Sequence, residues 1–125
     1  MNTPLIAIVD DDESVRIGTT SLVRSFGYEV QTFGSAEDFL CSQERHDTSC
    51  LISDIQMPGL GGLELQQALA AENSPMPIIF ITAYPDANIR QLALQAGAVG
   101  FLSKPFDGDT LMGCLERVFG SGSVS

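Results

Sequence analysis

Four apolar segments of this chain lead directly into polar residues that could take part in chemistry. Residues 5–9 precede Asp10-Asp11-Asp12-Glu13, residues 50–53 precede Asp54, residues 78–81 precede Thr82, and residues 99–102 precede Ser103-Lys104-Pro105. The carboxyl ends of parallel strands meet along one edge of a sheet. If the segments are such strands, carboxylates, a hydroxyl and a lysine gather at that edge. This combination is suited to holding a cation and handling a phosphoryl group.

The acidic run 10–13 has two interpretations. Acidic residues favour helix starts, so capping of a following helix explains one or two of them. Carboxylates a few ångströms apart also repel each other unless a cation lies between them. Every nearby ligand is oxygen, so a hard divalent cation fits, and Mg²⁺ fits best because it combines a few carboxylates with water and a substrate phosphate. The run alone leaves both roles, helix cap and metal site, open.

Asp54, Thr82 and Lys104 each have an ordinary explanation when taken singly. Asp54 could simply begin a loop, the β-branched Thr82 suits a strand, and Lys104 could be a solvated surface residue. Their joint position at the strand ends is what predicts a site. The Lys104-Pro105 pair also favours a fixed turn, for which a cis peptide bond is one option.

The elements that must position these groups follow an alternating pattern. Segments with strand character alternate with helical periodicity, which predicts an α/β fold with a parallel sheet. Strands are expected at residues 5–9, 29–33, 51–53, 78–81 and 99–102. Right-handed crossovers then give a three-layer, doubly wound, five-stranded sheet. The first, third and fourth strands are the most apolar and should be central, so the predicted order is 2-1-3-4-5.

In a sheet of this order, ligands bind where the first and third strands diverge. Asp10, Asp11 and Asp54 end those strands. The helix that Asp86 should cap has one apolar face, formed by residues at helical spacing: Ile89, Leu92, Ala93 and Ala96.

Composition limits the classes of function. The chain of 125 residues is expected to form one domain over residues 1–119, with a flexible Gly/Ser tail at 120–125. A net charge of −10 repels nucleic acid backbones, so we expect no direct nucleic acid binding. No apolar stretch approaches the ~20 residues that cross a bilayer, and a secretory signal is lacking. Cys41, Cys50 and Cys114 form no CxxC pair and are expected to be reduced, mostly buried thiols of a cytoplasmic protein.

Taken together, the motifs resemble the receiver domain of response regulators in two-component signalling. The matching residues are Ile8-Val9-Asp10-Asp11, Asp54 with Met57-Pro58-Gly59, Thr82-Ala83 and Lys104-Pro105-Phe106. They occur in the family's order and extend the resemblance over residues 4–119. The chain is most similar to receivers of transcription regulators like the nitrogen-fixation regulator, where Phe-x-x-Lys-Pro-Phe also closes the fifth strand. The resemblance implies the flavodoxin-like receiver fold.

The resemblance also implies a role for each matching acid. Asp54 would be the phosphoacceptor and would attack a phosphohistidine on a partner sensor histidine kinase. Asp11 and Asp54, with the backbone carbonyl of Gln56, would bind Mg²⁺. Asp10 would act on the cation through water.

The other implied roles concern the phosphoryl group and a switch. Lys104 would pair with the phosphoryl oxygens, and the Thr82 hydroxyl would hydrogen-bond to them after transfer. Phe101 would be the switching aromatic, although it lacks a hydroxyl. Phosphorylation would change the surface of the fourth helix, fifth strand and fifth helix, where a homodimer could form. Such a domain is a signalling receiver and not an enzyme, since it catalyses only its own phosphorylation and dephosphorylation.

Two other functions compete with this interpretation. A Mg²⁺-dependent phosphohydrolase of the common aspartyl-phosphate design needs a second acid two residues after the nucleophile, and Gln56 stands there. A pure interaction module would not need the intact set of Asp10, Asp11, Asp54, Thr82 and Lys104. Both alternatives are therefore disfavoured by the residues present.

Overall fold

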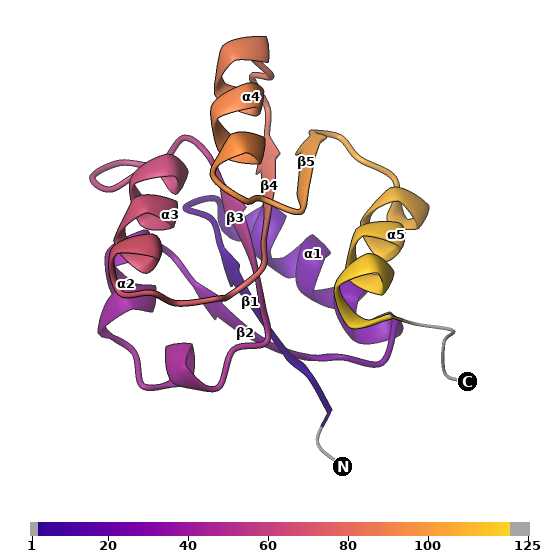
Figure 1. Ribbon diagram of the computed structural model, residues 1–125. Helices are drawn as coiled ribbons and strands as arrows, with labels where there is room; N and C mark the ends of the chain where they lie inside the picture. The colour runs from indigo at the N-terminus through magenta and orange to yellow at the C-terminus, as the bar shows by residue number, and fades with distance from the viewer. Residues whose placement is uncertain (1–2, 121–125) are drawn as a thin grey trace.

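The computed structural model describes residues 3–120 and contains, within them, one parallel sheet with strand order β2-β1-β3-β4-β5 (Figure 1). The strands are β1 (Leu5–Val9), β2 (Glu29–Phe33), β3 (Cys50–Asp54), β4 (Ile78–Thr82) and β5 (Gly100–Ser103). The helices are α1 (Glu13–Ser25), α2 (Ala36–Cys41), α3 (Gly62–Ala71), α4 (Ala87–Gln95) and α5 (Gly108–Phe119), with a 3₁₀ turn η1 (Glu44–His46). The predicted fold class and strand order are confirmed.

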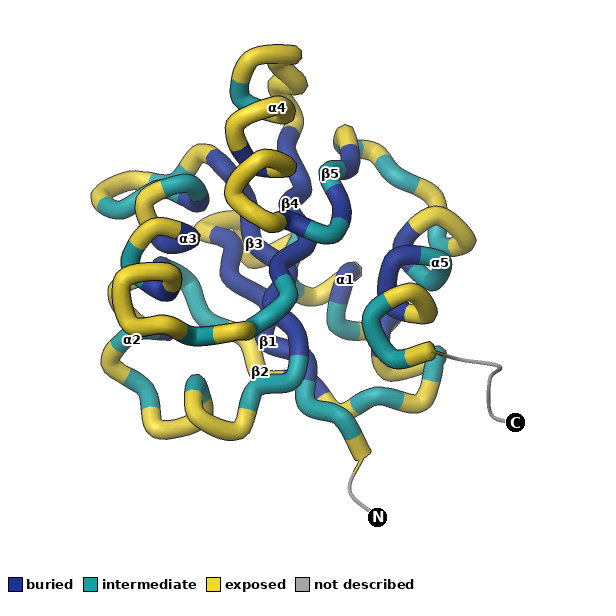
Figure 2. The backbone as a smooth tube through the Cα atoms, in the orientation of Figure 1, coloured by how far each residue is buried: buried dark blue, intermediate teal, exposed yellow. Residues whose placement is uncertain are grey.

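Helices cover both faces of the sheet, and each face buries its own core. In Figure 1, α1 and α5 lie on one side of the strands and α2 and α3 on the other. The first core packs Val23 of α1 and Leu111 and Leu115 of α5 against the sheet. The second packs Phe39 of α2 and Leu65 of α3 against the opposite face. Figure 2 shows the buried strands at the centre, which explains why β1, β3 and β4 are almost continuously apolar.

The strand register places the reactive residues at one edge. Val9 at the end of β1 pairs with Ser53 of β3, and Thr82 at the end of β4 pairs with Ser103 of β5. The residues that follow these strands therefore leave the sheet at the same edge, the one formed by the carboxyl ends of the strands. Neighbouring parallel strands are about 4.8 Å apart, so the side chains of these residues can meet.

Asp12 resolves part of the ambiguity in the acidic run. Its carboxylate accepts hydrogen bonds from the backbone N–H groups of Ser14 (2.8 Å) and Val15 (3.3 Å), so it is the N-cap of α1. Asp12 thus takes the capping role that the sequence left open.

The apolar face predicted for α4 is only partly buried, which corrects the sequence expectation. Ala93 is fully buried and Ile89 half-buried, but Leu92 is 57% exposed and Ala96 is also exposed. Figure 1 shows α4 standing beyond the other helices, so part of it has no sheet to cover. The helix packs against the second core through Ala93 and Ile89, and the Ala93 carbonyl accepts a hydrogen bond of 3.1 Å from Nε2 of Gln66.

The cysteines and the chain end also refine the predictions. Cys50 and Cys114 are buried as expected, whereas Cys41, at the end of the short helix α2, is exposed. Burial raises the pKa of the Cys50 thiol to about 12. The last described helix is α5, and Gly120 caps it with a φ of 65°. The rest of the predicted tail, residues 121–125, lies outside the described residues.

Within residues 3–120, no helix combines the length and the apolar character needed to cross a membrane.

Replacing Gly62 with alanine is expected to destabilise the domain by about 1–3 kcal/mol, because the new methyl group overpacks a closed site. A Cβ at Gly62 would overlap the carbonyl oxygen of Asp54 and lie 3.0 Å from the Phe80 ring. The matched control is Gly18→Ala in α1, where a Cβ meets nothing within 4 Å. That control should gain about 0.5–1 kcal/mol from helix propensity. Chemical denaturation measures both changes, and a Gly62→Ala variant as stable as the wild type would contradict the packing described here.

Candidate functional site

Three carboxylates gather beyond the ends of β1 and β3. Asp10, Asp11 and Asp54 each offer an oxygen, and these oxygens all lie within 4.8 Å of one another. Asp10 is completely buried, Asp54 is 6% exposed, and Asp11 faces solvent. The predicted cluster therefore exists and opens outward on the Asp11 side.

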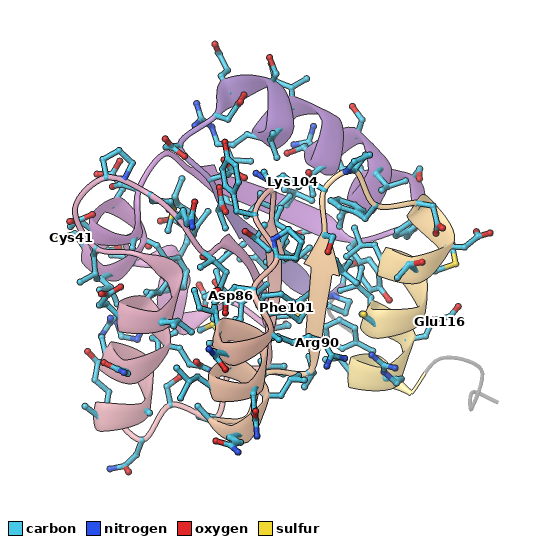
Figure 3. All side chains as sticks on the ribbon, turned by 90° about the horizontal axis from the view of Figure 1, so that it is seen from above. Cys41, Asp86, Arg90, Phe101, Lys104 and Glu116 are labelled. Atoms are coloured by element: carbon cyan, nitrogen blue, oxygen red, sulfur yellow. The ribbon has the colours of Figure 1, made fainter. Side chains whose placement is uncertain are left out.

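Lys104, which directly follows the edge strand β5, contacts two carboxylates of the cluster. Its Nζ lies 3.1 Å from Oδ2 of Asp10 and 3.2 Å from Oδ2 of Asp54. Figure 3, seen from above, shows Lys104 near the middle of the molecule, whereas Cys41 lies at the periphery. The Lys104-Pro105 peptide bond is cis, the form that the sequence had left as one option.

The charges in this cluster shift the pKa values of two groups. Burial raises the pKa of Asp10 and outweighs the opposing hydrogen bonds from the Asp12 N–H and from Lys104. Burial alone would lower the pKa of Lys104, but its contacts with Asp10 and Asp54 outweigh burial and raise it. At neutral pH Lys104 is therefore protonated and offsets part of the negative charge.

Thr82 lies at the end of β4 with a buried side chain that is 1% exposed. Its Oγ1 accepts a hydrogen bond of 3.1 Å from the backbone N–H of Tyr84, so in this conformation the hydroxyl is engaged with its own loop. The carbonyl of Thr82 accepts from the backbone N–H of Lys104 at 2.7 Å. This bond joins the last residue of β4 to the first residue after β5.

Phe101 lies on β5 and is half-buried against the second core, on the α4 side of the sheet (Figure 3). It does not belong to the carboxylate cluster. The structure thus brings Asp10, Asp11, Asp54 and Lys104 together and leaves Phe101 outside the cluster, and the switch role of Phe101 stays a prediction.

Gln56 follows Asp54 in the loop to α3. Its backbone N–H lies 3.3 Å from Oδ1 of Asp54, which fixes the orientation of that carboxylate. The coordination of a cation by the Gln56 carbonyl stays a prediction.

Two residues near the site carry contacts that sequence reasoning missed. Arg16 on α1 donates from Nη1 to the backbone carbonyl of Asp10 at 2.7 Å. Glu37 on α2 accepts from the backbone N–H of Leu60 at 3.0 Å. Neither contact has a local sequence signal, because a side chain that bonds to a distant backbone group leaves no periodicity or motif.

The donor set fits a hard divalent cation. All three acidic ligands present oxygen, no sulfur or imidazole takes part in the cluster, and an exposed side remains at Asp11 for water or a phosphate oxygen. Three carboxylates with one lysine leave net negative charge, which attracts a cation. Mg²⁺, which keeps several waters, meets these conditions.

Comparison with known proteins gives the same family as the resemblance of the sequence motifs. The sequence matches the response regulator receiver domain over residues 6–116. It is 46% identical over 108 residues to Nodulation protein W of Bradyrhizobium diazoefficiens, covering 86% of this chain and 48% of that protein. It is 38% identical over 111 residues to the Transcriptional regulatory protein FixJ of the same organism, covering 89% of this chain and 54% of FixJ. The chain therefore spans about half the length of these curated relatives.

A solved structure supports the match at the level of the whole domain. The structure described as FIXJ-N superposes with a TM-score of 0.84 at 32% identity and covers 97% of both chains. The sequence match, the strand order and the cluster of acids beside a lysine all agree. The chain belongs to the response regulator receiver domain family of two-component systems, and among its relatives are regulators of the nitrogen-fixation type.

Proposed function

We propose that this receiver domain accepts a phosphoryl group on Asp54 from a phosphohistidine of a sensor histidine kinase. The observation that carries the proposal is the position of the Asp54 carboxylate, held beside Asp10 and Asp11 and 3.2 Å from the Lys104 Nζ. A carboxylate oxygen of Asp54 would attack phosphorus, forming an O–P bond while the N–P bond to the donor imidazole breaks. The imidazole nitrogen then takes up a proton.

The surrounding residues would position and stabilise the transferring group. Asp11, Asp54 and the Gln56 carbonyl, with Asp10 through water, would hold Mg²⁺, which supplies positive charge opposite the phosphoryl oxygens when bound. Lys104 is preorganised at the same place and would move its hydrogen bonds from Asp10 and Asp54 to the new oxygens.

Transfer would give Thr82 a new partner and so bias the conformation of the domain. The Thr82 hydroxyl now accepts from Tyr84 N–H, and after transfer it could donate to a phosphoryl oxygen instead. The backbone bond between Thr82 and Lys104 would pass this movement to the end of β5, the strand that carries Phe101. A ligand that contacts one conformation better shifts the population toward it.

The proposal includes an output surface formed by α4, β5 and α5, through which the phosphorylated domain controls a partner or forms a homodimer. The exposed Leu94 on α4 supports this choice, because it lines one surface depression together with the half-buried Phe101 of β5 and Thr110 of α5. Light scattering should show a larger dimer fraction when beryllofluoride mimics the phosphoryl group. Equal monomer fractions with and without beryllofluoride would count against dimerisation.

Incubation of the wild-type protein with a small phosphodonor, with and without Mg²⁺, tests the proposal. Intact mass should increase by one phosphoryl group, and only when Mg²⁺ is present. A phosphohydrolase would instead release phosphate through many turnovers of a small ester, and an interaction module would gain no mass. Either of those results would reject the proposed function.

Mg²⁺ is expected to bind in the millimolar to sub-millimolar range and to stabilise the fold by about 1–3 kcal/mol near saturation. The reason is that the cation relieves repulsion among Asp10, Asp11 and Asp54, which Lys104 offsets only in part. Removing the exposed ligand in Asp11→Ala should abolish most of the Mg²⁺-induced rise in melting temperature. The control Asp47→Ala removes an exposed acid outside the cluster and should keep the rise. An Asp11→Ala variant with the full wild-type response would contradict the metal site.

A further inference from the structure

The loop between β3 and α3 is held at its tip by a side chain from another element. This loop begins after Asp54 and carries Gln56, so its path determines where the Gln56 carbonyl points. At the tip, the backbone N–H of Leu60 donates to Oε2 of Glu37 at 3.0 Å, across 23 residues of sequence.

The backbone of Glu37 is held in place by the packing of α2, and its side chain lies at the surface. Its neighbours Ala36 and Phe39 are both fully buried in the second core, and the Phe39 ring packs edge-on against Phe33 with centroids 5.3 Å apart. The N-cap Ser35 holds the first turn of the helix through its bond to the Asp38 N–H. The carboxylate of Glu37 therefore projects toward the loop from an anchored helix.

Gly59 shows how closely the loop approaches this carboxylate. A Cβ at Gly59 would lie 2.6 Å from Oε2 of Glu37, and the φ of Gly59 is +75°, a backbone conformation that favours glycine. The glycine thus allows both the turn and the close approach. The hydrogen bond to Leu60 and the contact with Gly59 are separate observations, and both place Glu37 against the loop tip.

Other contacts hold the ends of the same loop. The backbone N–H of Gly62 donates to the Ile55 carbonyl at 2.9 Å, and the Gly61 N–H donates to Oε1 of Glu64 at 3.1 Å. These bonds fix the start of α3. In the stretch before it, Met57 and Leu60 pack against the second core, and Glu37 adds the side-chain hydrogen bond to the loop tip.

We propose that Glu37 is a positioning residue for phosphoryl transfer to Asp54, acting through the β3–α3 loop that carries Gln56. The inference rests on the proposed function and names a residue that touches neither the phosphoryl group nor the cation. Without the Glu37 carboxylate, the loop tip samples other positions, and the Gln56 carbonyl spends less time in the geometry that transfer and cation binding need.

The test compares Glu37→Ala, which removes the acceptor, with Glu37→Gln, which keeps an oxygen acceptor but loses the charge. Asp38→Ala is the matched control, since it removes an exposed acid from the same helix. For each protein, the rate of mass gain from a small phosphodonor and the Mg²⁺ affinity by titration calorimetry are measured. Circular dichroism confirms that each variant is folded.

Glu37→Ala should take up phosphoryl groups roughly three- to tenfold more slowly and bind Mg²⁺ several-fold more weakly, the scale expected for loss of one solvent-exposed hydrogen bond. Glu37→Gln and Asp38→Ala should stay within about twofold of the wild type. The inference is overturned if Glu37→Ala matches the wild type in both measurements, or if Glu37→Gln or Asp38→Ala is slowed equally, which would indicate a charge effect. Should the wild type itself gain no mass, the proposed function fails, while the Mg²⁺ titrations still decide the role of Glu37.

Discussion

An Asp54→Asn variant is expected to take up no phosphoryl group from a small phosphodonor under conditions in which the wild type is fully modified. An amide is a poor nucleophile, and its product with phosphorus is not formed under such conditions. The substitution keeps an oxygen that can accept the Gln56 N–H, and Lys104 keeps its contact with Asp10, so the fold should persist. Intact mass spectrometry measures the result.

The control for this experiment is Asp47→Asn, which removes an exposed carboxylate after η1. It should be modified like the wild type. Mass gain in Asp54→Asn at the wild-type rate would show that another group accepts the phosphoryl group. A loss of uptake in Asp47→Asn would show that the assay responds to charge alone.

The second large effect is expected from Lys104→Met, which keeps an aliphatic side chain but removes the ammonium group. In Mg²⁺-free buffer at neutral pH, the free energy of unfolding should fall by about 2–4 kcal/mol, because Asp10 and Asp54 are left buried and uncompensated. Phosphoryl uptake at Asp54 should slow by about 100-fold or more, since a preorganised charge at the transition state is lost. Urea denaturation and the rate of mass gain measure the two changes.

The difference in unfolding free energy between wild type and Lys104→Met should become smaller both at high pH and at low pH. The folded-state pKa of Lys104 is raised, so its contribution is fully present below its unfolded value and is lost as pH rises through the folded pKa. The folded-state pKa of Asp10 is also raised, so protonation of Asp10 removes one partner before its ordinary value is reached on acidification. The difference should therefore be largest near neutrality.

A second variant separates loss of a charge pair from loss of packing. If uncompensated carboxylates cause the destabilisation, Asp10→Asn added to Lys104→Met should restore much of the lost stability. If the double variant is no more stable than Lys104→Met, the ion pairs seen between Lys104 and the two acids do not determine stability.

Much of this site was predictable because strand ends in a parallel sheet are a strong geometric constraint. Once the apolar runs before Asp10, Asp54, Thr82 and Lys104 are assigned as strands, topology brings their ends together. The roles within the acidic run 10–13, with Asp12 as helix cap and Asp10 and Asp11 in the carboxylate cluster, were not predictable in the same way. Asp10, Asp11 and Asp12 all precede the first helical residue, Glu13, so which of them caps the helix depends on where the extended backbone turns into α1, and residue type does not encode that point.

The sequence does not predict how much of a helix face the sheet buries, nor which side chain bonds to a backbone group far away in the sequence. The periodicity of α4 gives a face that includes Leu92, but it does not tell how far the sheet extends beneath the helix, and Leu92 is 57% exposed. The bond from Leu60 to Glu37 is likewise invisible in the sequence, since it depends on how α2 and the β3–α3 loop pack. The engagement of the Thr82 hydroxyl with Tyr84 N–H is a choice of rotamer and could not be foreseen either.

The proposed function depends most on which residue carries the phosphoryl group. Reduction of the freshly phosphorylated protein with borohydride converts an aspartyl phosphate into homoserine, and peptide mass spectrometry then locates that residue. We expect homoserine at position 54 and at no other position. Homoserine at another aspartate, or a phosphoryl group retained on His46, the one histidine of the sequence, would contradict the central claim.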